Sequence, residues 1–141
     1  MKTFSIFTDG VARGNPGPAA IGVVIKTEHS EKIGEISKRI GETTNNFAEY
    51  TAVLEALTWL IKNKHNISWS PDDNIQFFLD SKIVVNQLNG LFKVKNGKLR
   101  ELLMQVRILE QEVGVSVNYQ LIPREKNWQA DILVNRALDE E

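Results

Sequence analysis

Four carboxylates occupy positions where folding would bring them together. Asp9 and Asp80 each end a short apolar run, and Glu49 and Asp131 each fall in the first turn of a helical pattern. Strand ends and helix starts meet at one edge of an α/β sheet, where such proteins build their sites. Because like charges gathered there repel one another, the cluster needs a divalent cation. The spacing therefore favours a metal-dependent nuclease.

Two of these acids have competing structural explanations that concern helix starts. Glu49 falls on the apolar face of its helix, where an unpaired charge is costly. With Asn46, however, it also has the spacing of a capping box, so both explanations stay open. Asp131 has the ordinary explanation that an acid in a first turn stabilises the positive end of the helix dipole.

The other two acids have equally ordinary explanations. Asp80 can cap the helix that begins at Ser81, and Asp9 with Gly10 can form only a turn. None of these explanations accounts for all four acids being at strand ends or adjoining helix starts. That coincidence supports a shared site.

Length and composition limit the remaining possibilities. The chain has 141 residues and no cysteine, so we expect a single domain over residues 1–141, without disulfides or thiolate metal ligands. With only His29 and His65 as imidazole ligands, oxygen ligands and hard ions such as Mg²⁺ or Mn²⁺ are favoured. No segment is apolar enough to cross a membrane, and Met1 leads into a strand-like segment without a signal region. We therefore expect a cytoplasmic protein.

The charge pattern allows only a local nucleic-acid footprint. The formal net charge is −1, which argues against binding by bulk electrostatics. Between Leu91 and Arg100 the chain carries a run of basic side chains beside Phe92. For a basic run taken alone, a solvated loop and helix start is the favoured explanation. Only its combination with an acidic metal site favours nucleic-acid binding.

Hydrophobic periodicity predicts an α/β domain with the order β-β-β-α-β-α-α-β-α. The expected strands are 3–8, 19–26, 32–40, 75–79 and 115–122, and the expected helices are 46–62, 81–88, 98–112 and 127–138. A glycine- and proline-rich loop is expected between Asp9 and Pro18. The first three strands are expected to form an antiparallel meander.

Four sequence motifs resemble those of type 1 ribonuclease H, in the same order and over nearly the whole chain. They are residues 8–10 with 14–22, residues 44–50, residues 79–81, and residues 124–131. The resemblance implies the ribonuclease H-like fold, a mixed five-stranded sheet with helices on both faces. It also implies a single ribonuclease H domain. Nothing in the sequence requires a partner subunit, so we expect no obligate protein partner and a monomer.

The resemblance implies an endonuclease that hydrolyses the RNA strand of an RNA/DNA hybrid and leaves 5′-phosphate and 3′-hydroxyl ends. The family's acids match Asp9, Glu49, Asp80 and Asp131, which would bind two divalent ions, Mg²⁺ or Mn²⁺. A two-metal mechanism needs no covalent enzyme intermediate.

Five polar residues match the family's substrate contacts. Asn15, Asn45 and Asn46 match residues that contact the minor groove and the ribose hydroxyls of the RNA, for which short amides are suited as donors and acceptors. Thr44 and Asn96 match residues that hold a phosphate of the DNA strand. Turn and helix-cap roles explain the asparagines without any substrate.

The chain departs from the family at two places. Many relatives carry a histidine before the last helix, where this chain has Arg124. Arginine cannot act as a base at neutral pH, so its role would be electrostatic. The segment 89–98 is too short for the long basic protrusion of some bacterial members.

Three other functions fit the sequence less well. A 3′ to 5′ exonuclease of the same fold usually carries Asp-x-Glu on its first strand, whereas here Val11 follows Asp9 and Gly10. A nucleotide-binding enzyme would need a Walker lysine and a helix after the glycine-rich loop. A binding module that has lost catalysis would be expected to lack one of the acids.

Overall fold

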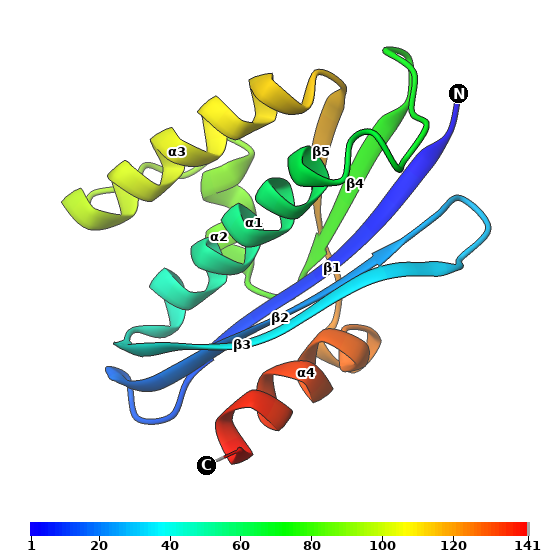
Figure 1. Cartoon of the computed structure of the whole chain (residues 1–141). Helices are drawn as coiled ribbons and strands as arrows, with labels where there is room; N and C mark the ends of the chain where they lie inside the picture. The colour runs from blue at the N-terminus through cyan, green and yellow to red at the C-terminus, as the bar shows by residue number, and fades with distance from the viewer. Residues whose placement is uncertain (141) are drawn as a thin grey trace.

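The computed structural model describes residues 1–140, and the last residue of the expected domain, Glu141, lies outside them. Strands and helices follow one another in the predicted order, with one short 3-10 helix added before the last helix (Figure 1). The strands are β1 (Thr3–Ala12), β2 (Gly17–Lys26), β3 (Lys32–Thr43), β4 (Asn74–Leu79) and β5 (Ser116–Leu121). The helices are α1 (Asn45–Lys62), α2 (Lys82–Leu88), α3 (Gly97–Val113), the 3-10 helix η1 (Arg124–Lys126) and α4 (Trp128–Asp139).

The strands form one mixed sheet in the order β3-β2-β1-β4-β5. β1 pairs antiparallel with β2 and parallel with β4, while β2 pairs antiparallel with β3 and β4 pairs parallel with β5. In Figure 1, α1, α2 and α3 lie on one side of the sheet and α4 lies on the other. The predicted meander and the predicted fold, with helices on both faces, are therefore confirmed.

Most of the core lies between the sheet and α1. Strand β4 alternates half-buried and buried residues, as expected when one face of a strand packs on a helix. The largest fully buried side chains include Ile6 of β1, Phe77 of β4 and Leu57 of α1, each of which stabilises the fold by roughly 1.5–3 kcal/mol. A smaller cluster around Val134 lies beneath α4. Within residues 1–140, no helix has the length and apolar character needed to span a bilayer.

Strand β1 is longer than the sequence predicts. The expected strand ends at Thr8, but β1 continues to Ala12 and stays paired with β2, so that Asp9 lies inside the strand. The glycine at position 10 favours a turn in the sequence. In the structure it allows α1 to approach, since a Cβ there would collide with the backbone of Ala48. The expected loop from Asp9 is therefore wrong.

Candidate active site

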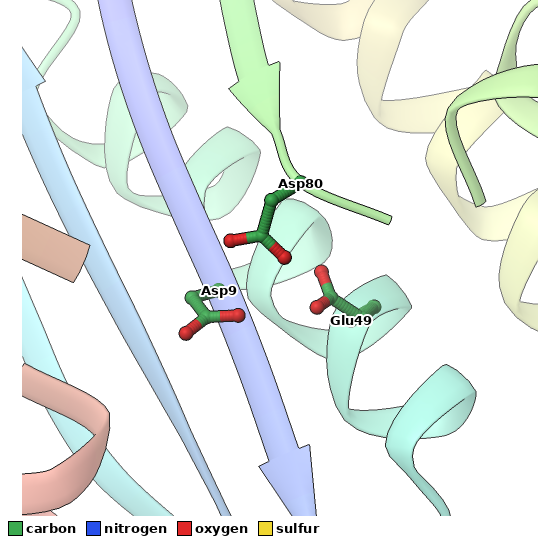
Figure 2. A group of neighbouring side chains, drawn as sticks. All are labelled: Asp9, Glu49 and Asp80. Atoms are coloured by element: carbon green, nitrogen blue, oxygen red, sulfur yellow. The ribbon is translucent and has the colours of Figure 1, made fainter. Parts of the chain in front are cut away.

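Three of the four acids converge where the parallel pairing of the neighbouring strands β1 and β4 ends. Asp9 comes from β1, Glu49 from α1, and Asp80 directly follows β4; Figure 2 shows their carboxylates turned toward one another. Each offers one oxygen, and these oxygens lie within 4.8 Å of one another. The predicted convergence is confirmed for these three acids.

The sheet register explains why Asp9 and Asp80 are neighbours. Strands β1 and β4 run parallel, and their pairing ends at Phe7 and Phe78. Asp9 and Asp80 both lie two residues beyond this last pair, so their side chains are at the same level along the two strands. Gly10 then lets α1 pack closely enough to bring Glu49 to them.

The capping role considered for Glu49 is wrong. Thr44 caps α1, because its hydroxyl oxygen accepts the backbone N–H of Phe47 at 3.2 Å. Glu49 lies beyond the first turn and is buried, and its Oε2 has no hydrogen-bond partner among residues 1–140. Such an oxygen costs roughly 1–3 kcal/mol unless something pairs with it.

The capping role considered for Asp80 is also wrong. Ser81 caps α2, and its hydroxyl oxygen accepts the backbone N–H of Val84 at 3.3 Å. The carboxylate of Asp80 is therefore available to the site, where it remains half-buried.

Burial and crowding shift the ionisation of two carboxyls. Burial, followed by the charge of Asp80, raises the pKa of Asp9 to about 7. Burial, followed by the charge of Asp9, also raises the pKa of Glu49 well above its usual range. A cation placed among these groups would favour their ionised forms. Cation binding at this site would therefore release protons.

The donor set fits a hard divalent cation. The group offers only carboxylate oxygens, which are the ligands that Mg²⁺, Mn²⁺ and Ca²⁺ prefer. The buried Oε2 of Glu49 supplies an oxygen that gains a partner when a cation binds. The structure thus contains an acidic triad that could hold metal.

Asp131 and Arg124 lie at the margin of this triad. Asp131 is in the first turn of α4, as predicted, and is not among the three acids whose oxygens converge. It is nevertheless near enough for its charge to raise the pKa of Asp9. Arg124 lies in η1 and lines the same pocket of about 330 Å³ as Asp9, Glu49 and Asp80.

The five polar residues expected to contact substrate line one groove next to the acidic pocket. This groove has a volume of about 960 Å³ and includes Asn15, Thr44, Asn45, Asn46 and Asn96. Asn45 and Asn46 also line the acidic pocket, so the two hollows adjoin. Residues 46 and 96 are 50 positions apart in the chain, and only the fold brings them together.

Two asparagines of the groove have structural hydrogen bonds. Asn15 Oδ1 accepts the backbone N–H of Asn45 at 2.9 Å, and Asn45 Oδ1 accepts the backbone N–H of Ala12 at 2.7 Å. These bonds tie the β1–β2 turn to the start of α1. They occupy the amide oxygens and orient the amide nitrogens elsewhere.

The basic run of the sequence meets the groove at one residue. Lys98 lines the groove, whereas Lys93 and Lys95 are exposed side chains that do not line it. Phe92 is 46% exposed, as its sequence context predicts.

Sequence reasoning gave no role to two residues beside the triad. Gly22 pairs with Asp9 across β1 and β2, and a Cβ there would collide with the Ala130 carbonyl oxygen of α4. A glycine inside an apolar strand is a signal for such a close approach. Asn127 precedes α4 and resembles an ordinary helix cap in the sequence, but its side chain bonds to Asp80.

Comparison with known proteins agrees with this fold and site. Residues 7–137 match the family described as Reverse transcriptase-like. The structure of LC11-RNase H1, isolated from compost by a metagenomic approach, superposes with a TM-score of 0.90 at 43% identity, covering 99% of this chain and 97% of that one. The chain therefore belongs to this family, and within it to the type 1 ribonucleases H.

Individual relatives agree with that assignment. The chain is 36% identical over 137 residues to ribonuclease HI of Halobacterium salinarum, covering 95% of this chain and 63% of that protein. It is 38% identical over 135 residues to the bifunctional protein Rv2228c of Mycobacterium tuberculosis, covering 95% of this chain and 35% of that protein. This chain thus spans about a third of the length of the mycobacterial relative. LC11-RNase H1 in complex with an RNA/DNA hybrid also matches, with a TM-score of 0.89 at 42% identity over 96% of each chain.

Proposed function

We propose that this chain is an endoribonuclease that hydrolyses the RNA strand of RNA/DNA hybrids. The observation that carries the proposal is the convergence of Asp9, Glu49 and Asp80 next to a polar groove, with Glu49 Oε2 buried and unpartnered within residues 1–140. The complex of LC11-RNase H1 with such a hybrid supports this choice of substrate. We further propose a single domain over residues 1–141 that acts as a monomer in the cytoplasm.

Four carboxylates would hold the metal ions. Asp9, Glu49 and Asp80 form the converging group, and Asp131 approaches from α4. Two ions, Mg²⁺ or Mn²⁺, would supply activation of the attacking water and stabilisation of the leaving 3′ oxygen. The protein's part is to hold the carboxylates close together, and the bound cations would favour their ionised forms.

Arg124 would supply positive charge at the edge of the site. Burial raises the pKa of Asp9, and the guanidinium charge of Arg124 offsets a small part of that rise, which supports a position close to the reacting phosphate. Arginine stays protonated at neutral pH, so it would stabilise negative charge on the phosphate without accepting a proton.

The asparagines beside the acidic pocket would recognise the RNA strand. The oxygens of Asn15 and Asn45 accept backbone N–H groups, which directs their NH₂ groups away from those bonds. An amide donor held in this way can bond to a ribose 2′-hydroxyl, the group that distinguishes RNA from DNA. Asn46 lines both hollows and would contact the RNA strand next to Asn15 and Asn45.

The groove would also hold a phosphate of the DNA strand. Helices α1 and α3 both begin there, with Thr44 and Asn96 as their caps. Helix N-termini attract anions through their N–H groups and dipoles. Lys98 adds a positive charge in the same groove.

Matched duplexes test the proposed function. RNA/DNA, RNA/RNA and DNA/DNA duplexes of one sequence are incubated with Mg²⁺, Mn²⁺ or a chelator, with the RNA ends blocked. We expect internal cuts in the RNA of the hybrid, 5′-phosphate products, and no cutting with chelator. Cutting only when the RNA ends are left unblocked would indicate an exonuclease, and binding without any cutting would indicate an inactive binding module; either result would refute the proposal.

A further inference from the structure

Asn127 lies where three of the elements that carry the acids meet. It directly precedes α4, and its carbonyl oxygen accepts the backbone N–H of Asp131 at 3.1 Å. Its side-chain Nδ2 donates to the carbonyl oxygen of Thr8 at 2.8 Å and to Asp80 Oδ2 at 2.9 Å. A single residue thus connects β1, the segment after β4, and the first turn of α4.

The side chain of Asn127 serves the site and not its own helix. It is fully buried and makes no capping bond to α4 within the described residues. Both of its partners are acceptors, which fixes the amide with its nitrogen toward them. Its Oδ1, the atom that an N-cap asparagine uses, is buried without a partner in the part of the chain that the structure describes. The two N–H donors are therefore what this residue contributes.

Asp80 is the member of the triad that most needs such support. Asp9 and Glu49 are buried, whereas Asp80 is only half-buried. Mutual repulsion among three carboxylates favours rotation of the most exposed one toward water. The bond from Asn127 opposes that rotation, and the bond to Thr8 anchors the same amide to the residue before Asp9.

We propose that Asn127 is a positioning residue that holds Asp80 in the geometry at which it can share a divalent cation with Asp9 and Glu49. The inference rests on the proposed function, since it requires that these carboxylates bind a cation. Hydrogen-bond partners of metal ligands typically change metal affinity or activity by roughly 10–100-fold when they are removed. An effect of this size is expected for Asn127.

Mn²⁺ binding tests the proposal without relying on cleavage. Free Mn²⁺ is measured by electron paramagnetic resonance for the wild type, Asn127→Ala and Asn127→Leu, of which the leucine variant preserves volume without adding a ligand. We expect affinity to fall by roughly tenfold or more. With hybrid substrate, kcat should fall while KM stays within about twofold. Asn127→Ser, which retains one donor, should recover part of the affinity.

Asn89→Ala is the matched control. Asn89 also donates its amide from a helix end to a strand carbonyl, that of Tyr119, at 3.2 Å. We expect this variant to bind Mn²⁺ as the wild type does, so an equal loss of affinity there would overturn the inference.

The outcomes separate this inference from the proposed function. Mn²⁺ affinity within twofold of wild type in a folded Asn127→Ala or Asn127→Leu variant would overturn the positioning role. Unfolding of all three Asn127 variants, seen by circular dichroism, would make Asn127 a folding residue and also overturn it. A wild type that binds no Mn²⁺ or leaves the hybrid intact would refute the proposed function itself.

Discussion

The two ends of α1 each border a hollow, but only one of the hollows contains buried charged groups that lack a partner. At its start, a pocket of about 330 Å³ contains crowded carboxylates and the unpartnered Glu49 Oε2. At its other end, a cavity of about 460 Å³ is lined by apolar side chains such as Phe4 and Trp59. Lys2 lines that cavity too, and its ammonium donates to the carbonyl oxygen of Ser68 at 2.7 Å.

Buried charge, and not volume, distinguishes the acidic pocket from this apolar cavity. The larger cavity also has acids and a histidine at its rim, Glu28, Glu31 and His29, but these residues are exposed to water. Water solvates such groups at little cost, whereas buried like charges require a counterion. Cation binding at the acidic pocket therefore relieves the repulsion between the carboxylates, whereas the exposed acids at the other end of α1 gain little from a cation.

The largest expected effect comes from removing one charge of the triad. Asp80→Asn keeps the size of the side chain, and we expect hybrid cleavage with Mg²⁺ to fall at least about a thousandfold, or about 4 kcal/mol, because a metal ligand is lost. Folding should be unaffected, since one repelling charge is removed. The matched control is Glu31→Gln, the same change at the other cavity, which should leave the rate within about twofold. Near-normal cleavage by Asp80→Asn would contradict the assignment.

The second effect concerns stability without metal. Folded Asp9 holds its proton up to about pH 7, whereas its reference pKa is 3.8. Between these pH values the folded chain binds more protons than the unfolded chain, so the free energy of unfolding falls as pH rises. The contribution of this group is at most about 4 kcal/mol. Thermal unfolding in chelator should therefore show a lower Tm at pH 8 than at pH 5.

The Asp9→Asn variant isolates that contribution. Its Tm should fall less between pH 5 and pH 8 than that of the wild type. Added Mn²⁺ should stabilise the wild type more at pH 8, because the carboxyls must lose protons to bind it. Parallel pH profiles for the two proteins would show that Asp9 does not carry the shifted pKa.

A smaller effect is expected from Arg124, which lines the crowded pocket but is exposed. Arg124→Ala should lower kcat by roughly tenfold to a hundredfold, because one positive group near the phosphate is lost. KM should change less, and Arg124→Lys should restore part of the rate. Steady-state kinetics on the hybrid measures this split; an unchanged kcat would leave Arg124 without a catalytic role.

The smallest effect is expected at the groove. Asn96 Oδ1 caps α3 by accepting the N–H groups of Lys98 and Leu99 at 2.9 and 3.1 Å. Asn96→Asp retains this cap but puts a negative charge beside the proposed phosphate, so KM should rise several-fold at low salt with little change in Tm. Asn96→Ala should instead cost about 1 kcal/mol of stability. If Asn96→Asp binds hybrid as the wild type does, Asn96 is only a cap.

The sequence predicted the architecture because its elements have clear periodicity. Helix α3 is an example, since its expected range of 98–112 differs by one residue at each end from the observed Gly97–Val113. The local details that were wrong depend on tertiary contacts. Strand β1 passes through Gly10 because α1 packs there, which a turn-like Asp-Gly pair does not reveal.

The sequence predicted which acids form the candidate site, but it did not predict which residue holds them in place. Spacing selected four acids, and three of them, Asp9, Glu49 and Asp80, converge in the structure. The apolar runs before Asp9 and Asp80 and the helix face of Glu49 follow from periodicity. The bonds of Asn127 join residues 119 and 47 positions away, which no local pattern contains. The metal-binding role of the four acids and the roles of Arg124 and of the groove residues stay predictions.

Anomalous scattering from crystals soaked in Mn²⁺ tests the central claim most directly. The claim is that the triad exists to bind divalent cations. We predict manganese peaks between the carboxylates of Asp9, Glu49 and Asp80, and none at the cavity lined by Trp59. Carboxylates without any peak between them, at Mn²⁺ concentrations that support cleavage, would contradict the account.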